Sequence, residues 1–233
     1  MESLRIDVIV PAAGVGKRMQ LSIPKQYAKI GKLTVLEHTV YALLKCPYVN
    51  KVIVGVSDTD EYFDSLEISS HPQVIKGIGG KERSDTVRLN MDKVTTEYVM
   101  VHDAARPLVK VEDLNKLSLL AKNHVDGAML AVKCADTLKK VIDGKVVTTV
   151  PRENIYRAYT PQMGKTKLLQ KALNYANDNH LAITDDASAL ELIGCEVLIV
   201  EGSADNFKLT TPDDLKMANL LIEDIHVLNL TRV

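Results

Sequence analysis

Short apolar runs recur along the chain and alternate with segments in which apolar residues return every three or four positions. Val and Ile dominate several of these runs without polar alternation, which is typical of strands covered on both faces of a sheet. The runs predict strands at "IDVIV" from Ile6, "KVIVGVS" from Lys51, "QVIKGI" from Gln73, "YVMVHDA" from Tyr98, "GAMLAVK" from Gly127 and "CEVLIVEG" from Cys195.

The segments between these runs carry the apolar period of amphipathic helices. In the segment 211–225, Thr211 is a suitable N-cap, Pro212 takes the first helical position, and two acids follow in the first turn. The same period predicts helices at 34–46, 111–124, 165–178 and 184–194. Strands that alternate with helices predict a single α/β domain over residues 1–233, with a mainly parallel sheet flanked by helices.

One segment interrupts this alternation. It has strand-like runs on both sides of Asp143-Gly144, within "DTLKKVIDGKVVTTVPREN" from Asp136. An Asp-Gly pair between two such runs is a strong local signal for a β-hairpin. We therefore expect residues 134–156 to form an antiparallel arm inserted into the sheet domain.

Composition narrows the range of partners. The chain has a formal net charge of -1, so it has no general basic field for nucleic acid, and any anion site must be local. No apolar run approaches the roughly 20 residues of a membrane helix, and the N-terminus has no targeting pattern, which predicts a cytoplasmic protein without membrane contact. The cysteines are odd in number and far apart, so we expect buried thiols and neither zinc nor disulfides, at Cys46, Cys134 and Cys195.

The stretch "VIVPAAGVGKRMQLSIPKQY" from Val8 ends a predicted strand in a turn of small residues. It does not match two common phosphate-binding loops. Met19 stands where the dinucleotide fingerprint needs a third glycine, and Arg18 follows Gly16-Lys17 where the Walker loop needs Ser or Thr.

Backbone amides at a strand-to-helix turn nevertheless form a nest for an anion, and small side chains let the ligand approach. The small residues are Ala12, Ala13, Gly14 and Gly16. Arg18 and Lys25 add two full positive charges, and this combination suits a triphosphate better than a single phosphate. A tight turn with two solvated charges is the alternative.

Asp103 follows the predicted strand "YVMVHDA", and open α/β sheets bind ligands at the carboxyl ends of their strands. A carboxylate there is a natural ligand for Mg2+, which takes one or two acids together with phosphate oxygens; a simple turn acid is the alternative. Arg106 either contacts a substrate phosphate or braces the turn, and we expect a structural role for His102. Asp205 is a possible second metal ligand.

A second turn of small residues precedes a predicted helix at Gly79, Gly80 and Thr86. Together with Ala12 to Gly14, these residues could close on a flat nucleotide base.

Six segments, taken in order, carry a resemblance to a known family. They are "PAAGVGKRM" with "PKQY", "GGKERSDTV" at Gly79, "HDAARP" at His102, "PRENIYRAYTPQ" at Pro151, "ITDDASALE" at Ile183 and "EGSADNFKLTTPDDL" at Glu201. Over nearly the whole chain they resemble the 2-C-methyl-D-erythritol 4-phosphate cytidylyltransferases of the non-mevalonate isoprenoid pathway.

The resemblance implies a Rossmann-like fold of the nucleotide-diphospho-sugar transferase type, with the hairpin as a dimerisation arm exchanged within a homodimer. It implies transfer of a cytidylyl group from CTP to a polyol phosphate, methylerythritol 4-phosphate, with release of pyrophosphate and use of Mg2+. The implied catalytic residues are Arg18, Lys25, Arg152 and Lys208. The implied nucleotide site comprises Ala12, Ala13, Gly14, Gly16, Gly79, Gly80, Thr86, Asp103 and Ala104. The implied site for the polyol phosphate comprises Asp103, Arg106, Thr137, Arg152, Thr160 and Lys208.

Two other functions remain open at the level of sequence. A cytidylyltransferase that makes CDP-ribitol from ribitol 5-phosphate shares the glycine loop and a similar arm. A catalytically silent nucleotide-binding protein could use the same fold, although the complete set of charged residues argues against it.

Overall fold

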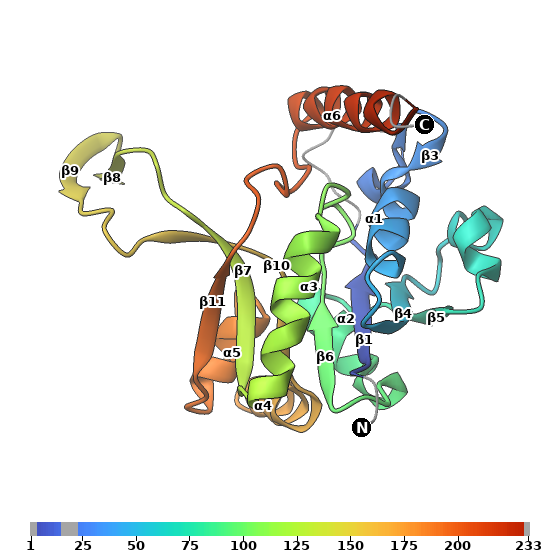
Figure 1. Ribbon diagram of the computed structural model, residues 1–233. Coiled ribbons are helices and arrows are strands. Elements are labelled where there is room, and N and C mark those ends of the chain that lie inside the picture. The colour runs from blue at the N-terminus through green and yellow to red at the C-terminus, as the bar shows by residue number, and fades with distance from the viewer. Residues whose placement is uncertain (1–3, 15–22, 231–233) are drawn as a thin grey trace.

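A computed structural model describes residues 4–14 and 23–230 of the chain, the last eight of them by their backbone (Figure 1). Its centre is a seven-stranded sheet with the order β11-β7-β10-β6-β1-β4-β5. Its strands are β1 (Ile6–Pro11), β4 (Val49–Val56), β5 (Val74–Ile78), β6 (Tyr98–Val101), β7 (Gly127–Lys133), β10 (Tyr156–Lys165) and β11 (Val197–Glu201). The α-helices are α1 (Val35–Leu44), α2 (Arg83–Leu89), α3 (Val111–Leu119), α4 (Thr166–Asp178), α5 (Asp186–Leu192) and α6 (Pro212–Leu230).

The sheet is mixed and mostly parallel, as the sequence predicts. Strands β6, β1, β4 and β5 form one parallel block, and β11 pairs parallel with β7. Strand β10, which was not predicted from the sequence, lies antiparallel between β6 and β7. Its residues read as a chemical motif because polar and apolar side chains mix without a clear period in "YRAYTPQMGK".

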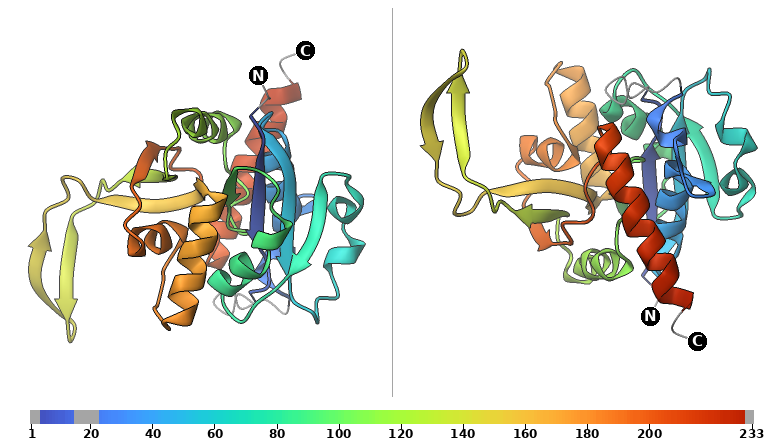
Figure 2. Two further views of the ribbon diagram at one scale, coloured as in Figure 1. Left: turned by 90° about the horizontal axis from the view of Figure 1, so that it is seen from below. Right: turned by 90° about the horizontal axis from the view of Figure 1, so that it is seen from above.

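Helices cover both faces of the sheet (Figure 2). On one face, Val8 and Val10 of β1 belong to the core cluster that contains residues of α1 and α3. On the other, Ile9 packs in a cluster with residues of α2, α4 and α5. Successive residues of a strand point to opposite faces, so the unbroken apolar run of β1 serves two cores at once.

Local capping determines where several helices begin. Thr34 caps α1 in a box with Glu37, whose backbone amide donates to the Thr34 hydroxyl at 3.2 Å. The Thr211 hydroxyl accepts a hydrogen bond from the Asp214 amide at the start of α6, which confirms the predicted cap. No helix among residues 4–14 and 23–230 combines the length and apolar character that crossing a membrane requires.

The segment around Asp143-Gly144 forms a two-stranded antiparallel ribbon of β8 (Leu138–Ile142) and β9 (Lys145–Val150). Asp143 and Gly144 both have positive φ, 50° and 76°, as a tight hairpin turn with matching twist requires. The ribbon projects away from the helices and the main sheet (Figure 1). Two short strands, β2 (Lys29–Ile30) and β3 (Leu33–Thr34), form another small ribbon before α1.

The three thiols are free. Cys46 and Cys134 are buried as expected, whereas Cys195 is half-buried, because it precedes β11 at the edge of the sheet.

The order of the strands places a crevice at the carboxyl end of β1. The chain passes from β1 to β4 on one side and later returns to place β6 on the other side of β1. Ligands of open α/β sheets bind at such a switch point, outside the carboxyl ends of the strands. In this protein the residues after β1 and after β6 meet there.

Candidate active site

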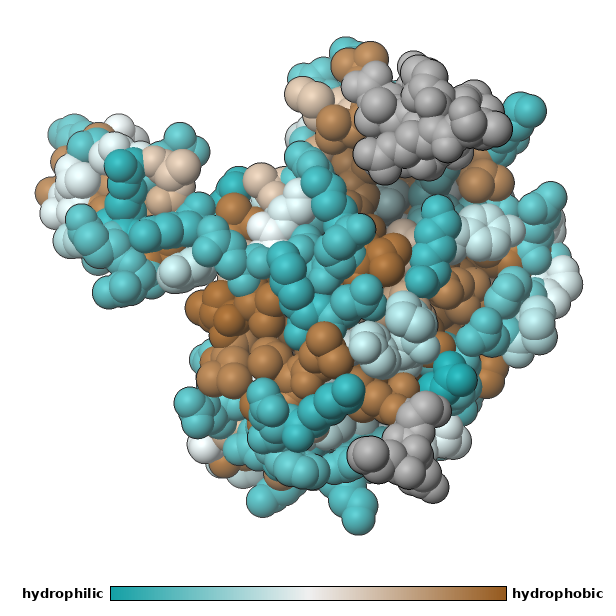
Figure 3. Space-filling model, viewed as in Figure 1, coloured by the Kyte–Doolittle hydropathy of each residue, from teal (hydrophilic) through white to brown (hydrophobic). Residues whose placement is uncertain are grey.

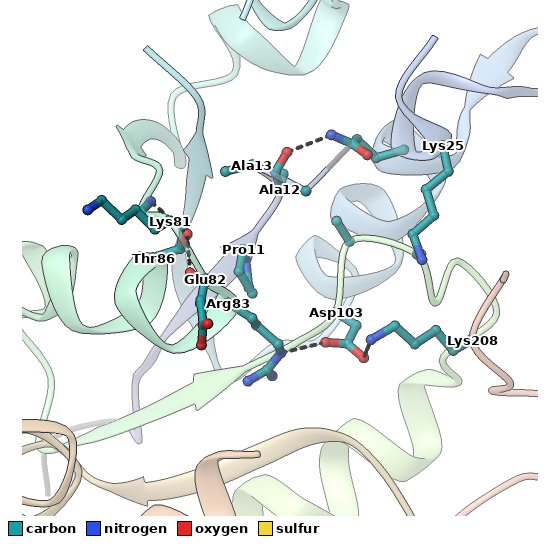
Figure 4. A pocket seen from close by; sticks show the side chains of 15 residues that line it. Pro11, Ala12, Ala13, Lys25, Lys81, Glu82, Arg83, Thr86, Asp103 and Lys208 are labelled. Atoms are coloured by element: carbon teal, nitrogen blue, oxygen red, sulfur yellow. Dashed lines mark hydrogen bonds and ion pairs between the residues drawn. The ribbon is translucent and has the colours of Figure 1, made fainter. Parts of the chain in front are cut away.

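A cavity of about 260 Å³ opens at the carboxyl end of β1, where β1, β6 and the start of α2 meet (Figure 4). More cationic side chains than carboxylates line it. The cations are Lys25, Lys81, Arg83 and Lys208, and the carboxylates are Glu82 and Asp103. Its remaining lining is largely small or apolar: Pro11, Ala12, Ala13, Gly14, Gln26, Gly80, Thr86, Ala104 and Ala105. The cavity therefore combines a net positive charge with close access to the backbone, which suits a polyanionic ligand.

Most residues assigned to the nucleotide from the sequence line this cavity. The residues that do so are Ala12, Ala13, Gly14, Gly80, Thr86, Asp103 and Ala104, with Lys25 and Lys208 from the catalytic set. Gly16 and Arg18 lie outside the described residues. Four further residues line the cavity without having been assigned from the sequence: Gln26, Lys81, Glu82 and Arg83.

The turn after β5 forms a narrow wall opposite Ala13. A Cβ atom placed on Gly79 would lie 2.6 Å from the Cβ of Ala13, so only glycine fits there. A Cβ on Gly80 would lie 2.3 Å from the Cβ of Asp85, and the Gly80 amide donates to the Thr86 hydroxyl at 2.9 Å. The close approach of Gly79 to Ala13 brings the two small-residue turns together, and their closing on a flat base stays a prediction.

Asp103 is the centre of the site's charge. Its carboxylate lies 2.8 Å from Nε of Arg83, 2.9 Å from Nζ of Lys208 and 3.3 Å from Nε of Arg106. Burial by itself would raise the pKa of Asp103, but the three cations together hold it well below its usual range. Asp103 is therefore ionised at neutral pH.

Arg83 lines the cavity and contacts Asp103, yet it was not identified from the sequence. It is the first residue of α2, and it lies between two carboxylates because its Nη2 also contacts Asp186 at 2.8 Å. Burial by itself lowers the pKa of Arg83, yet these two carboxylates raise it above its usual value. The only signal in the sequence was its place next to the glycine turn, in "GGKERSDTV".

Arg106 and Thr160 lie behind Asp103 and outside the cavity lining. Arg106 is buried, and its Nη1 donates to the carbonyl oxygen of Asn206 at 2.7 Å. Its guanidinium also stacks on the Tyr159 ring, 4.5 Å from the centroid. The Thr160 hydroxyl accepts from the Asp103 amide at 3.0 Å. Both residues brace the turn that carries Asp103.

His102 is fully buried behind the same turn. Its Nδ1 lies 3.0 Å from the Thr160 hydroxyl, and its Nε2 lies 3.1 Å from the Arg106 carbonyl oxygen. Burial lowers the pKa of His102 to about 4. A neutral imidazole without access to the cavity fits the predicted structural role.

The depressed pKa of His102 predicts a stability that falls in mild acid. Between pH 6.5, the usual value for histidine, and about 4, the unfolded chain binds a proton that the folded protein does not. The free energy of unfolding should therefore fall by about 2 kcal/mol from this group between pH 7 and pH 5. Urea unfolding at the two pH values measures the difference. His102→Asn should lose this pH-dependent difference in unfolding free energy, and the exposed control His180→Asn should keep it. An equal pH dependence in the wild type and both variants would contradict this assignment.

The short 3-10 turn Lys25–Tyr27 (η2) brings Lys25 to the cavity. Its Nζ donates to the Leu209 carbonyl oxygen at 3.0 Å. Gln26 is buried and donates from Nε2 to the Ala12 carbonyl oxygen at 2.6 Å, which ties this turn directly to the end of β1. The side chain of Gln26 thus fixes the turn that carries Lys25 to the end of β1, in addition to the covalent connection between them.

Three residues assigned from the sequence lie elsewhere in the chain. Asp205 pairs with Lys110 at 2.7 Å, and it borders a different, apolar cavity, so the structure does not bring it to Asp103. Thr137 and Arg152 are exposed at the base of the ribbon, where Arg152 donates to the Ala135 carbonyl oxygen. Neither lines the cavity within one chain.

The donors in the cavity fit a divalent cation carried in by the nucleotide. Within the part of the chain that the structure describes, no group of three His, Cys, Asp or Glu side chains could hold a metal alone. An ionised carboxylate at the cavity, Asp103, can supply one ligand while phosphate oxygens supply others, which is the usual way proteins hold Mg2+.

Comparison with known proteins agrees with this geometry. The sequence model of one family, described as 2-C-methyl-D-erythritol 4-phosphate cytidylyltransferase, matches residues 6–224 of the chain. The chain belongs to this family. The residues around the cavity all lie within the matched part.

Members of the family are similar to this protein in sequence and in structure. The cytidylyltransferase of Vibrio parahaemolyticus is 46% identical over 219 residues, which cover 92% of this chain and 94% of that protein. That of Escherichia coli O157:H7 is 43% identical and covers 97% and 98%. The crystal structure of the Francisella tularensis enzyme aligns with a TM-score of 0.79 at 35% identity, covering 93% and 99%. The family's members are cytidylyltransferases by name, which confirms the enzyme class predicted from the sequence, and the likeness to this crystal structure confirms the predicted sheet fold. The role of the ribbon as a dimerisation arm stays a prediction.

Proposed function

We propose that this protein transfers the cytidylyl group of CTP to 2-C-methyl-D-erythritol 4-phosphate, giving 4-diphosphocytidyl-2-C-methyl-D-erythritol and pyrophosphate for isoprenoid precursor synthesis. The observation that carries the proposal is the cation-rich cavity around Asp103, at the carboxyl end of β1, in a chain that belongs to this family. The names of the relatives favour methylerythritol phosphate over ribitol phosphate as the acceptor.

The reaction needs positioning and charge stabilisation more than acid or base chemistry. The acceptor's phosphate oxygen is itself the nucleophile, and it displaces pyrophosphate in line at the α-phosphorus of CTP. The protein must bring two polyanions together and stabilise the charge that develops between them. Lys25 and Lys208, both lining the cavity, are suited to this task, and we assign Arg18 to it from the sequence.

The narrow wall formed by Ala13, Gly79 and Gly80 supports binding of the cytosine base. Because these residues lack bulk, the flat ring can lie against the backbone and hydrogen-bond to it. A side chain at Gly79 would meet backbone atoms of Val56 as well as the Cβ of Ala13, so the slot depends on glycine at this position. We propose that the limited width of this slot favours a pyrimidine over a purine.

Mg2+ fits the same cavity, and we propose Asp103 as the protein's ligand for it. The bound ion would neutralise phosphate charge and orient the triphosphate. Lys208, which contacts Asp103 here, can instead face the phosphates when nucleotide and metal bind.

The change Asp103→Asn should raise the Mg2+ concentration at half-maximal activity sharply, by roughly ten- to a hundredfold. The amide keeps the shape of the side chain but loses the negative charge that attracts the ion. Titration of activity against Mg2+ at saturating CTP measures the shift. Asp205→Asn is the matched control, because Asp205 lies at a different cavity. A wild-type titration in Asp103→Asn would show that Asp103 is only a turn acid.

The ribbon supports a homodimer with exchanged arms. Apolar side chains that are more than half exposed gather on it, at Val141, Ile142, Val146 and Val147. A two-stranded ribbon alone is marginally stable in water, so these side chains need a partner surface. A second copy of the arm related by a two-fold axis supplies one. We propose that Arg152 and Thr137 at the base of the arm reach the neighbour's cavity.

The test is pyrophosphate release from CTP. With methylerythritol 4-phosphate as acceptor, release should be rapid, and with ribitol 5-phosphate it should be slower by at least tenfold in kcat/KM. Faster release with ribitol 5-phosphate would replace the proposed acceptor. Absence of release with any pair of triphosphate and alcohol phosphate would mean a protein that binds nucleotides without catalysis.

A further inference from the structure

A buried carboxylate outside the cavity is connected to its centre through one side chain. Asp186 is the first residue of α5 and is 2% exposed. Its Oδ2 accepts from Nη2 of Arg83 at 2.8 Å, and Nε of Arg83 donates to Oδ1 of Asp103 at 2.8 Å. The half-buried guanidinium of Arg83 thus bridges a carboxylate at the cavity and a carboxylate behind it (Figure 4 shows the Arg83–Asp103 half).

The dipole of α5 favours an acid in its first turn, but it does not explain why Asp186 is buried. The helix is capped by Asp185, whose side chain accepts from the Ser188 amide at 2.9 Å. Within the described part of the chain, Oδ1 of Asp186 is buried without a hydrogen-bond partner. A buried carboxylate with half of its acceptors unused is costly, and burial raises its pKa in spite of Arg83. Such a group calls for an explanation beyond folding.

The geometry of the Arg83 guanidinium supplies an explanation for the buried carboxylate of Asp186. An Arg fork tends to engage a single carboxylate through two parallel hydrogen bonds. Here Nη2 of Arg83 donates to Asp186 instead, so Arg83 contacts only Oδ1 of Asp103. Oδ2 is left to Lys208 at 2.9 Å and to Arg106 at 3.3 Å. Without Asp186, the guanidinium of Arg83 could turn and bind both oxygens of Asp103. It would then displace the amine of Lys208 from Oδ2 of Asp103, on the side of the cavity.

We propose that Asp186 is a positioning residue for the transfer reaction, acting through Arg83 to keep one oxygen of Asp103 and the amine of Lys208 available to the substrates. The proposal rests on the cytidylyl transfer proposed above. It makes the N-terminus of α5, which contributes no side chain to the cavity lining, a determinant of turnover.

Asp186→Asn tests this with little change of shape. We expect kcat to fall roughly ten- to a hundredfold, as is typical when a group that orients an active-site side chain is removed, while KM for CTP changes less than threefold. Rates are expressed per folded molecule, with the folded fraction taken from circular dichroism. Asp185→Ala is the matched control, since it removes the cap of the same helix without touching Arg83; its kcat per folded molecule should stay within twofold of wild type.

A double-mutant cycle with Arg83→Gln separates positioning from a structural role. If Asp186 acts through Arg83, adding Asp186→Asn to Arg83→Gln should change kcat by less than twofold. The same fall in both backgrounds, or an unchanged kcat in Asp186→Asn alone, would overturn the proposal.

The cycle is also read from the affinity for CTP, measured by calorimetry without acceptor. Asp186→Asn should weaken this affinity in wild type, by less than threefold as for KM, and leave it unchanged in Arg83→Gln; an equal change in both backgrounds would likewise overturn the proposal. Because this readout needs no acceptor, it decides the role of Asp186 even if pyrophosphate release shows that the acceptor is a different alcohol phosphate.

Discussion

Replacing Lys25 with alanine should lower kcat roughly a hundred- to a thousandfold, while the affinity for CTP falls much less. Lys25 lines the cavity from the short turn after the glycine loop, and Gln26 next to it is tied to the end of β1. We assign Lys25 to charge that grows at the α-phosphorus during displacement. A contact of this kind stabilises the transition state by about 2.7–4 kcal/mol and the ground state by less.

Steady-state kinetics and CTP binding on the folded variant separate these two quantities. Lys29→Ala is the matched control, because Lys29 is exposed four residues further along and does not line the cavity; it should keep wild-type kinetics. Arg18→Ala should behave like Lys25→Ala if both cations meet the same charge. A fall in kcat of tenfold or less in Lys25→Ala would remove Lys25 from the catalytic residues.

Mixing two inactive variants should restore activity if the site is shared between subunits. Lys25→Ala and Arg152→Ala homodimers should each be nearly inactive, since each lacks one essential cation at both sites. In a mixed dimer with exchanged arms, one site collects both substitutions and the other collects none. Random exchange makes about half of the dimers mixed, so activity should recover to roughly a quarter of wild type.

The exchange of subunits must be demonstrated independently, for example by native mass spectrometry of chains with different tags. Mixing Lys25→Ala with Lys208→Ala is the matched control, because both residues line the cavity of one chain. Each site of a mixed dimer then carries one of the two substitutions, and no site is free of both, so this mixture should stay inactive. Lack of recovery with Arg152→Ala despite exchange would show that Arg152 acts within its own chain.

The local sequence was sufficient for elements whose signals are short in range. The apolar run of β1, the cap at Thr211 and the Asp143-Gly144 turn each depend on neighbouring residues, and all three appear where expected. The strand β10 was missed because its place in the sheet depends on pairing with β6 and β7, strands that lie far from it in the sequence.

The candidate site divides in the same way. Ala12, Ala13, Gly80 and Lys25 could be assigned from the sequence, since small residues at a strand end and cations behind them have a local chemical meaning. Arg83 could not, because its role depends on two carboxylates 20 and 103 positions further along the chain.

By itself, the sequence determined the class of fold, the glycine turn and the resemblance to a cytidylyltransferase, because periodicity, turn chemistry and motif order are properties of the chain. Only the tertiary structure decided that Arg106 and Thr160 brace the turn behind Asp103, that Asp205 belongs to another cavity, and that Asp186 is linked to Asp103. The physical reason is that ion pairs and burial depend on distances between residues remote in sequence, and folding of the sheet sets those distances.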